Sequence, residues 1–431
     1  MLDAVRNYSL FKNLNWRLAF IGAISSLGAM GFGFDNGWWE GALGLSEFQR
    51  KYGEWDEDLG QYTIPSHKAI GITLEASPVT SFWQLVVGRI IVYSGIGLAS
   101  NCVPLYPSEC SPRRIRGAFL ALYSFFNSLG VFLASIVVYL SRSQQDKWQY
   151  LIVILCELIV PVGYVSFYFL LPESPRYLVY RGRYDEAERV LRSLSNNPET
   201  IAQEVELLKA QDLEQRELHR ATSVWDCFKG TNLRRTIIAM GVQTLQQAQG
   251  VSFIQNFVVT FMEQLGFPDP LRSYLLVTGC SFAVHIITFL TFDKIGRRPS
   301  LFLGAILLAG TMIGTGAATS TGTAGNYSST AAEASVTLLI LWYCIYGFTG
   351  GPGCWVVAGE VGTGQLRERT LFLASMGSFV TSVPINFVNP YVQADLGGAV
   401  TFIHGAFSTK DRSLEELDDM FQAKVPTRKF S

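Results

Sequence analysis

Residues 117–141 read GAFLALYSFFNSLGVFLASIVVYLS, and none of these side chains is charged. At 1.5 Å per residue, a helix over this range is about 37 Å long, which exceeds the roughly 30 Å of a bilayer's hydrocarbon core. A soluble helix keeps one polar face, and this range lacks the charged face that such a helix turns to water. We therefore predict that it crosses a membrane as one helix.

The same absence of charge recurs along the chain of 431 residues. Only 16% of the residues are charged and 49% are hydrophobic, whereas a soluble domain is about a quarter charged. We predict an all-α integral membrane fold with nine or ten spanning helices. A tenth run at 396–409 would reach only about 21 Å, too short to cross comfortably. The nine longer spans are 17–38, 85–107, 117–140, 149–171, 236–258, 273–292, 299–319, 335–358 and 371–392.

Orientation follows from the basic loops, because short cytoplasmic loops carry an excess of Lys and Arg. Such loops follow the second, sixth and eighth predicted spans, on the same side as Lys12 and Arg17. We predict that this side is cytoplasmic. Residues 39–84, with seven acidic and three basic side chains, are then predicted to lie outside. The triplet Asn326-Tyr-Ser is also predicted outside and is a candidate glycosylation site.

The charge pattern divides the chain into four parts. We predict an amino-terminal membrane half over 1–172, a cytoplasmic linker over 173–235, a carboxy-terminal membrane half over 236–408 and a tail over 409–431. Within the linker, Glu, Arg, Leu and Ala dominate, which is typical of short amphipathic helices.

Patterns for other kinds of function are missing from the sequence. The seven cysteines form no CxxC pair and the four histidines are scattered, so we predict neither a metal site nor a disulfide framework. The sequence has no phosphate-binding loop and no nucleophile elbow. We expect no cofactor, no enzymatic activity and no nucleic-acid partner, whereas the lipid bilayer is a partner that the composition implies.

Three charged motifs lie at predicted cytoplasmic ends of the spans. They are Gly88-Arg89 leading to Pro104-Leu-Tyr-Pro-Ser-Glu109 and Arg116-Gly117, then Pro172-Glu-Ser-Pro-Arg176, then Asp293-Lys-Ile-Gly-Arg-Arg298. Their order and spacing resemble the sugar porters of the major facilitator superfamily, and the chain is similar to fungal hexose and α-glucoside permeases within it. The resemblance runs from about Phe34 to Tyr391.

The resemblance implies a secondary active transporter of a sugar or related polyhydroxylated solute. In this family two six-helix halves rock around a site near the middle of the membrane, which gives alternating access. It further implies a monomer in the plasma membrane. The sequence does not identify the sugar.

The resemblance also implies where the sugar binds. Gln246 and Gln247 match the family's QQ-x-x-G on its seventh helix, and Trp355 matches the tryptophan of GP-x-x-W-x-x-x-x-E on its tenth. Amides hydrogen-bond sugar hydroxyls and aromatic rings stack on the sugar's C–H face, so we predict that these three residues contact the substrate. The alternative is that the two amides only hydrogen-bond neighbouring helices.

Protons are a predicted co-substrate. Asp35 matches the acid that proton-coupled members of the family carry on the first helix, and Arg89 matches its arginine partner. An acid inside a membrane helix is costly, and protonation of Asp35 would weaken the pair and let the carrier change state. The alternative is a static ion pair that fixes the packing of the helices.

The cytoplasmic motifs carry charges of both signs. Such charges can pair while the carrier faces outward and separate when it opens inward. The alternative is that the basic residues only set the topology. The predicted gating charges are Glu109, Arg116, Glu173, Arg176, Asp293, Arg297, Arg298, Glu360 and Arg367.

The chain departs from the family in its number of helices. Members of the family have twelve, but helices two and three are missing between Trp39 and Gln84, and helix twelve is reduced to 399–408. The expected fold is therefore an incomplete major facilitator fold, either of a real shortened protein or of a faulty gene model or splice form.

Three amides of the family are also replaced. Ser124, Ser252 and Ser378 stand in their positions, which would leave fewer contacts to sugar hydroxyls. This favours a substrate other than glucose. Because helices two and three are missing, we expect that the chain does not transport at the rates usual in the family. A non-transporting membrane sensor and a truncated product without function are the two alternatives.

Overall fold

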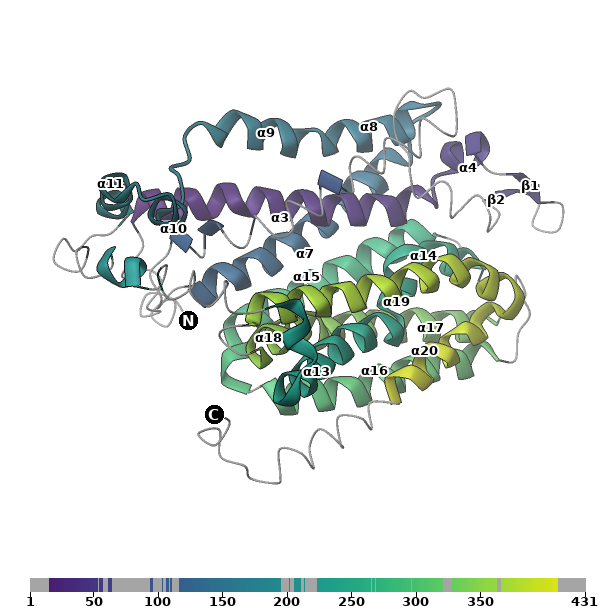
Figure 1. Cartoon of the computed structure of the whole chain (residues 1–431). Coiled ribbons are helices and arrows are strands. Elements are labelled where there is room, and N and C mark those ends of the chain that lie inside the picture. Colours follow the sequence, from purple (N-terminus) through teal and green to yellow (C-terminus); the bar gives the residue numbers. More distant parts are fainter. Residues whose placement is uncertain are drawn as a thin grey trace. The chain divides into compact units, whose positions relative to one another are not determined.

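The computed structural model describes most of the chain, and its helices are labelled in Figure 1. The described residues are 15–52, 54–56, 61–63, 94–95, 103, 106–107, 109–110, 116–194, 201, 205–210, 213, 223–264, 266–267, 269–295, 297–320, 328–362 and 366–409.

Among these residues, seven helices are long and apolar enough to cross a membrane. They correspond to seven of the nine predicted spans, which confirms the all-α integral membrane class. Of the other two, 85–107 lies almost entirely outside the described residues, and 236–258 is an interrupted helix. The seven are Trp16–Ala42, Leu122–Ser141, Trp148–Phe167, Pro270–Thr288, Pro299–Thr319, Thr330–Trp355 and Arg369–Gln393.

The first helix, α3 (Trp16–Ala42), runs four residues past its predicted end. The reason is burial, because Trp38, Trp39 and Ala42 are all at most 2% exposed and their packing continues the helix. Glu40, predicted to lie in the outer segment, lies inside α3 and is 3% exposed. The outer location of residues 39–84 remains a prediction.

A short helix and two short strands follow α3. They are α4 (Ser46–Tyr52), β1 (Glu54–Asp56) and β2 (Gln61–Thr63). The strands pair antiparallel, with Trp55 opposite Tyr62. This small sheet lies in the segment that was predicted to be outside the membrane.

The chain forms two compact units, and the first combines residues 1–35, 74–134 and 151–221. In this unit α3 crosses α7 (Arg116–Ser141) at two glycines. A β-carbon on Gly33 would overlap the carbonyl oxygen of Asn127, and one on Gly130 would overlap that of Met30. Small residues let membrane helices approach this closely, so these glycines fix where the two helices cross.

The predicted span 149–171 consists of two helices, α8 (Trp148–Glu157) and α9 (Ile159–Tyr168), with Leu158 between them. Pro161 has no N–H to donate to the carbonyl of Glu157, so one helical hydrogen bond is absent at this break. Two of the helices in the predicted linker are α10 (Pro175–Tyr180) and α11 (Tyr184–Leu194), which bury apolar side chains against each other. The domain boundaries remain a prediction.

The second unit combines residues 36–73, 135–150 and 222–431. Within it, α13 packs along α19, and α16 packs against both α17 and α20. Its elements are η1 (Val224–Phe228), α13 (Gly230–Gln246), η2 (Gln247–Val251), α14 (Ser252–Gln264), α15 (Pro270–Ile295), α16 (Arg297–Thr319), α17 (Ser329–Phe348), α18 (Gly350–Val361), α19 (Arg367–Leu396), η3 (Gly397–Ala399) and α20 (Val400–Thr409).

The short run at 396–409 behaves as its length predicts. It ends in α20, a helix of 10 residues, which at 1.5 Å per residue reaches about 15 Å. Such a helix cannot cross the hydrocarbon core by itself.

Candidate functional site

A π-helical turn interrupts the helix that carries the two predicted glutamines. This turn, η2, separates α13 from α14, and Gly250 within it has a φ of 108°. Such a φ is open to glycine and strained for other residues. Because π-turns often accompany functional sites, the side chains around η2 are candidates for one.

The turn brings Gln247 and Ser252, five residues apart, into contact. The Ser252 hydroxyl donates to Gln247 Oε1 at 2.7 Å, and Gln247 Nε2 donates to Ser378 Oγ on α19 at 3.0 Å. Ser252 and Ser378 are two of the positions where the family has amides. In this chain both serines bond to the predicted sugar-binding glutamine.

The polar contacts continue along α14 and α19 beyond Ser252. Its hydroxyl lies 3.3 Å from that of Ser382, which accepts a bond of 3.1 Å from Asn386 Nδ2. Asn256 Nδ2 donates to Asn386 Oδ1 at 3.0 Å. We call the six side chains that take part the polar ladder: Gln247, Ser252, Asn256, Ser378, Ser382 and Asn386.

Sequence reasoning missed the outer part of this ladder. The sequence contains a pattern that could have predicted it. Ser378, Ser382 and Asn386 recur every four residues in an apolar helix and so share one face. Asn256 lies four residues after Ser252 on the facing helix. The two asparagines supply amides in the same row as the serines that replace the family's amides.

Gln246 bonds in a different direction from Gln247. It is 4% exposed, and its Nε2 donates to the Tyr346 hydroxyl at 3.0 Å and to the Gly350 carbonyl at 3.3 Å. The Tyr346 ring stacks on Trp342 with centroids 5.1 Å apart. In this structure Gln246 therefore joins α13 to α17 and α18, as in the alternative that the amides bond neighbouring helices.

Trp355 lies on α18 and is 53% exposed. The structure does not bring its indole into a described hydrogen bond with Gln246 or Gln247. Its role as a sugar contact remains a prediction.

Of the two residues in the predicted proton-coupling pair, the structure describes only one. Asp35 is 1% exposed within α3, whereas Arg89 lies outside the described residues. Their pairing remains a prediction.

The predicted gating charges are described in part. Glu109 Oε2 accepts a hydrogen bond of 2.5 Å from the hydroxyl of Ser174, and Ser174 also caps α10 by accepting from Tyr177 N–H. The first two of the motifs that are predicted to be cytoplasmic thus meet within one unit, through a serine. Glu173 is exposed and Arg176 is half-buried. The side chains of Arg116, Asp293, Arg297, Arg298, Glu360 and Arg367, and Asn326 as a whole, lie outside the described part of the chain.

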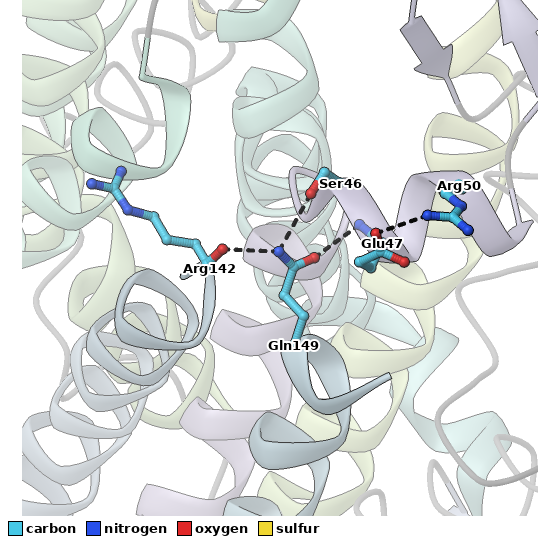
Figure 2. Close-up of polar contacts among 5 residues, drawn as sticks. All are labelled: Ser46, Glu47, Arg50, Arg142 and Gln149. Atoms are coloured by element: carbon cyan, nitrogen blue, oxygen red, sulfur yellow. Dashed lines mark hydrogen bonds and ion pairs between the residues drawn. The ribbon is translucent and has the colours of Figure 1, made fainter. Parts of the chain in front are cut away.

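At the opposite, predicted outer side, Gln149 joins three segments of the second unit (Figure 2). Its Nε2 donates to the carbonyl of Arg142 at 3.0 Å and to Ser46 Oγ at 3.3 Å, and its Oε1 accepts from Glu47 N–H at 2.9 Å. The side chain is 3% exposed, so these bonds satisfy a buried amide. They tie α4 to the ends of α7 and α8.

Comparison with known proteins identifies relatives for this arrangement. A family model described as "Sugar (and other) transporter" matches residues 66–409. The major facilitator-type transporter ecdD of Aspergillus rugulosus is 26% identical over 94% of this chain and 87% of its own length. The high glucose sensor RGT2 of Saccharomyces cerevisiae is 27% identical over 80% of this chain, which spans 48% of that longer protein.

A solved structure shares the fold. It is the xylose transporter XylE from E. coli in a partially occluded inward-open conformation, with a TM-score of 0.70. The match covers 95% of this chain and 99% of that one, at 18% identity. At this identity the likeness shows the fold alone, and it confirms the major facilitator architecture.

Proposed function

The chain belongs to the sugar transporter family, and from that premise we propose that it moves a sugar or related polyhydroxylated solute across a membrane by alternating access, coupled to protons. The substrate is not chemically changed. The multi-pass membrane protein would act as a monomer in the plasma membrane.

The polar ladder is the observation that carries this proposal. Polar side chains inside membrane helices are costly and need partners. Amides and hydroxyls both donate and accept hydrogen bonds, so the ladder can exchange its internal bonds for bonds to sugar hydroxyls. Gln247 is central to it, because it contacts both replaced positions, Ser252 and Ser378.

Trp355 adds an aromatic face to the proposed site. An accessible indole can stack on the apolar C–H face of a sugar ring. Combined with the amides, this would distinguish polyhydroxylated rings from purely apolar solutes.

Asp35 supports the coupling to protons. It is a buried acid in the first membrane helix, and the energetic cost of such a group makes a function its default interpretation. Protonation would remove its charge and allow the helices around it to rearrange. The contact between Glu109 and Ser174, at the predicted cytoplasmic side, would break and form in the same cycle.

Flux through reconstituted vesicles tests the proposal. The purified full chain in vesicles should accumulate radiolabelled D-glucose or D-xylose when the outside is made acidic, and accumulation should stop when an ionophore removes the proton gradient. Asp35→Asn should lose the accumulation yet keep exchange of labelled for unlabelled sugar. Uptake that does not depend on the proton gradient would refute coupling, and no flux of either sugar would refute transport of these sugars.

A sensor function is the second candidate, because RGT2 is among the relatives. A sensor would bind sugar, seen as a change in tryptophan fluorescence, without moving it. Binding without flux in the same vesicles would favour the sensor.

A further inference from the structure

Glu40 is a carboxyl group enclosed in the second unit. It lies on α3 only two residues from the end of the helix, yet it is 3% exposed. Its neighbours on the helix, Trp38 and Trp39, are also buried. The mechanism proposed above makes no use of this acid.

Two tyrosines from other helices face the carboxyl group. The Tyr343 hydroxyl on α17 lies 3.5 Å from Glu40 Oε1 and equally far from the carbonyl of Ile254. The Tyr274 hydroxyl on α15 donates to the carbonyl of Gly37, three residues before Glu40 on α3, at 2.9 Å. Among the described side chains, the polar neighbours of this acid are thus neutral tyrosine hydroxyls.

The described partners give an ionised carboxylate little stabilisation, because the contact from Tyr343 is long, at 3.5 Å. Glu40 Oε2 has no hydrogen-bond partner among the described residues, and no described base forms an ion pair with the group. A buried charge without a cation carries a large desolvation cost. A neutral carboxylic acid avoids that cost, and the tyrosine hydroxyls remain suitable partners for it.

The other described groups around Glu40 supply no positive charge that would stabilise its ionised form. Gly41, the next residue, packs on the apolar Val138 of α7. The acid on α14 is Glu263, which lies close to Gly44, two residues after the carboxyl end of α3. It accepts hydrogen bonds from Gln49 Nε2. A second acid can only oppose ionisation of the first.

We propose that Glu40 carries a proton in this arrangement and releases it when α3 separates from Tyr274 and Tyr343, so that it is a proton-carrying residue of the transport cycle. This inference rests on the proposed function. On separation, water reaches the carboxylic acid, its O–H bond breaks, the electron pair stays on the carboxylate and the proton passes to water. On closure, the carboxylate takes a proton back before it is buried.

Infrared difference spectroscopy tests the protonation without any need for transport. The purified full chain should show the C=O stretching band of a protonated carboxyl at neutral pH. Glu40→Gln should remove one component of this band. Glu47→Gln, which alters an acid paired with Arg50 on the nearby α4, should keep that component, and so should Glu263→Gln. A band that is unchanged in Glu40→Gln would overturn the inference.

Transport in vesicles tests the coupling. If the wild-type chain takes up protons together with sugar, Glu40→Gln should lose proton uptake while it retains sugar exchange. Proton uptake at the wild-type ratio in Glu40→Gln would overturn the role of Glu40 and leave proton coupling itself intact. A wild-type chain without proton coupling would instead overturn the proposed function, and with it the transport role of Glu40, whatever the spectrum of the variant.

A second variant covers the case in which Glu40→Gln does not fold. Tyr343→Phe removes the hydroxyl that lies 3.5 Å from Oε1 and leaves the acid in place. It should shift the carboxyl band to higher frequency, because the carbonyl loses a hydrogen-bond donor. A band at the wild-type frequency would contradict the arrangement on which the inference stands.

Discussion

Arg142, at the end of α7, and Asp269, just before α15, form an ion pair with 2.6 Å between Nη1 and Oδ2. The guanidinium also lies over the ring of Tyr139, 3.9 Å from its centroid. The pair therefore fixes the predicted outer end of α7 to the start of α15. Both partners are about one-third exposed, at 36% and 34%, so water weakens the attraction between them.

The first prediction concerns this ion pair and pH. Desolvation alone would raise the pKa of Asp269, but hydrogen bonds from Arg142 and from the backbone N–H of Arg272 hold it below its ordinary value. The stabilisation is thus complete above the unfolded-state pKa of about 3.9, and it is lost as pH falls through the lower folded-state pKa. Asp269→Asn should lower stability by less than about 1 kcal/mol at neutral pH.

Thermal unfolding in detergent, followed by tryptophan fluorescence from pH 8 to pH 3, measures this effect. The difference in Tm between wild type and Asp269→Asn should stay constant down to about pH 5 and shrink below about pH 4. Asp146→Asn, an exposed acid in the same loop as Arg142, serves as the control and should show no difference. A difference in Tm between wild type and Asp269→Asn that increases as the pH falls would contradict the ion pair.

The second prediction separates sugar binding from helix packing at Gln247. Gln247→Leu removes the amide that bonds both Ser252 and Ser378. If the amide also contacts the sugar, the KM for transport should rise about tenfold, which corresponds to ~1.4 kcal/mol. The control is Gln255→Leu, because Gln255 is an exposed amide on the same helix. A lower Tm with an unchanged KM would mean that Gln247 only packs helices.

The third prediction concerns Trp355. Trp355→Ala should raise the KM, because the sugar would lose an aromatic face worth about 1 kcal/mol, whereas Trp355→Phe should recover much of the affinity. Trp225→Ala, which removes a 74% exposed indole from η1, is the matched control. Equal KM values for all four proteins would move the aromatic contact elsewhere.

The fourth prediction concerns the π-turn. Gly250→Ala should lower stability by about 1–3 kcal/mol, because alanine is strained at a φ of 108° and its β-carbon would lie 2.6 Å from Met312 Cε. Gly241→Ala is the matched control. This glycine lies inside α13, where no atom would come within 4 Å of the added carbon, so the change should be neutral or stabilising. The Tm of the purified proteins measures both effects.

Periodicity and motifs predicted the membrane class and the helix that carries the amides. They also identified Gln246 and Gln247 as polar groups in an apolar helix. They did not predict that the two side chains bond in different directions, since this depends on the register imposed by η2. Nor did they predict Asn256 and Asn386, although their spacing from Ser252 and Ser382 was visible.

The sequence by itself determined how many stretches can cross a membrane, where charged motifs interrupt them and which family they resemble. These properties are local, because the length of an apolar run and the order of motifs need no partner. Only the tertiary structure decided that Glu40 is buried, and that Ser252 and Ser378 bond to Gln247. Burial and hydrogen bonding depend on side chains that come from helices distant in the chain, and sequence distance does not report which of them meet.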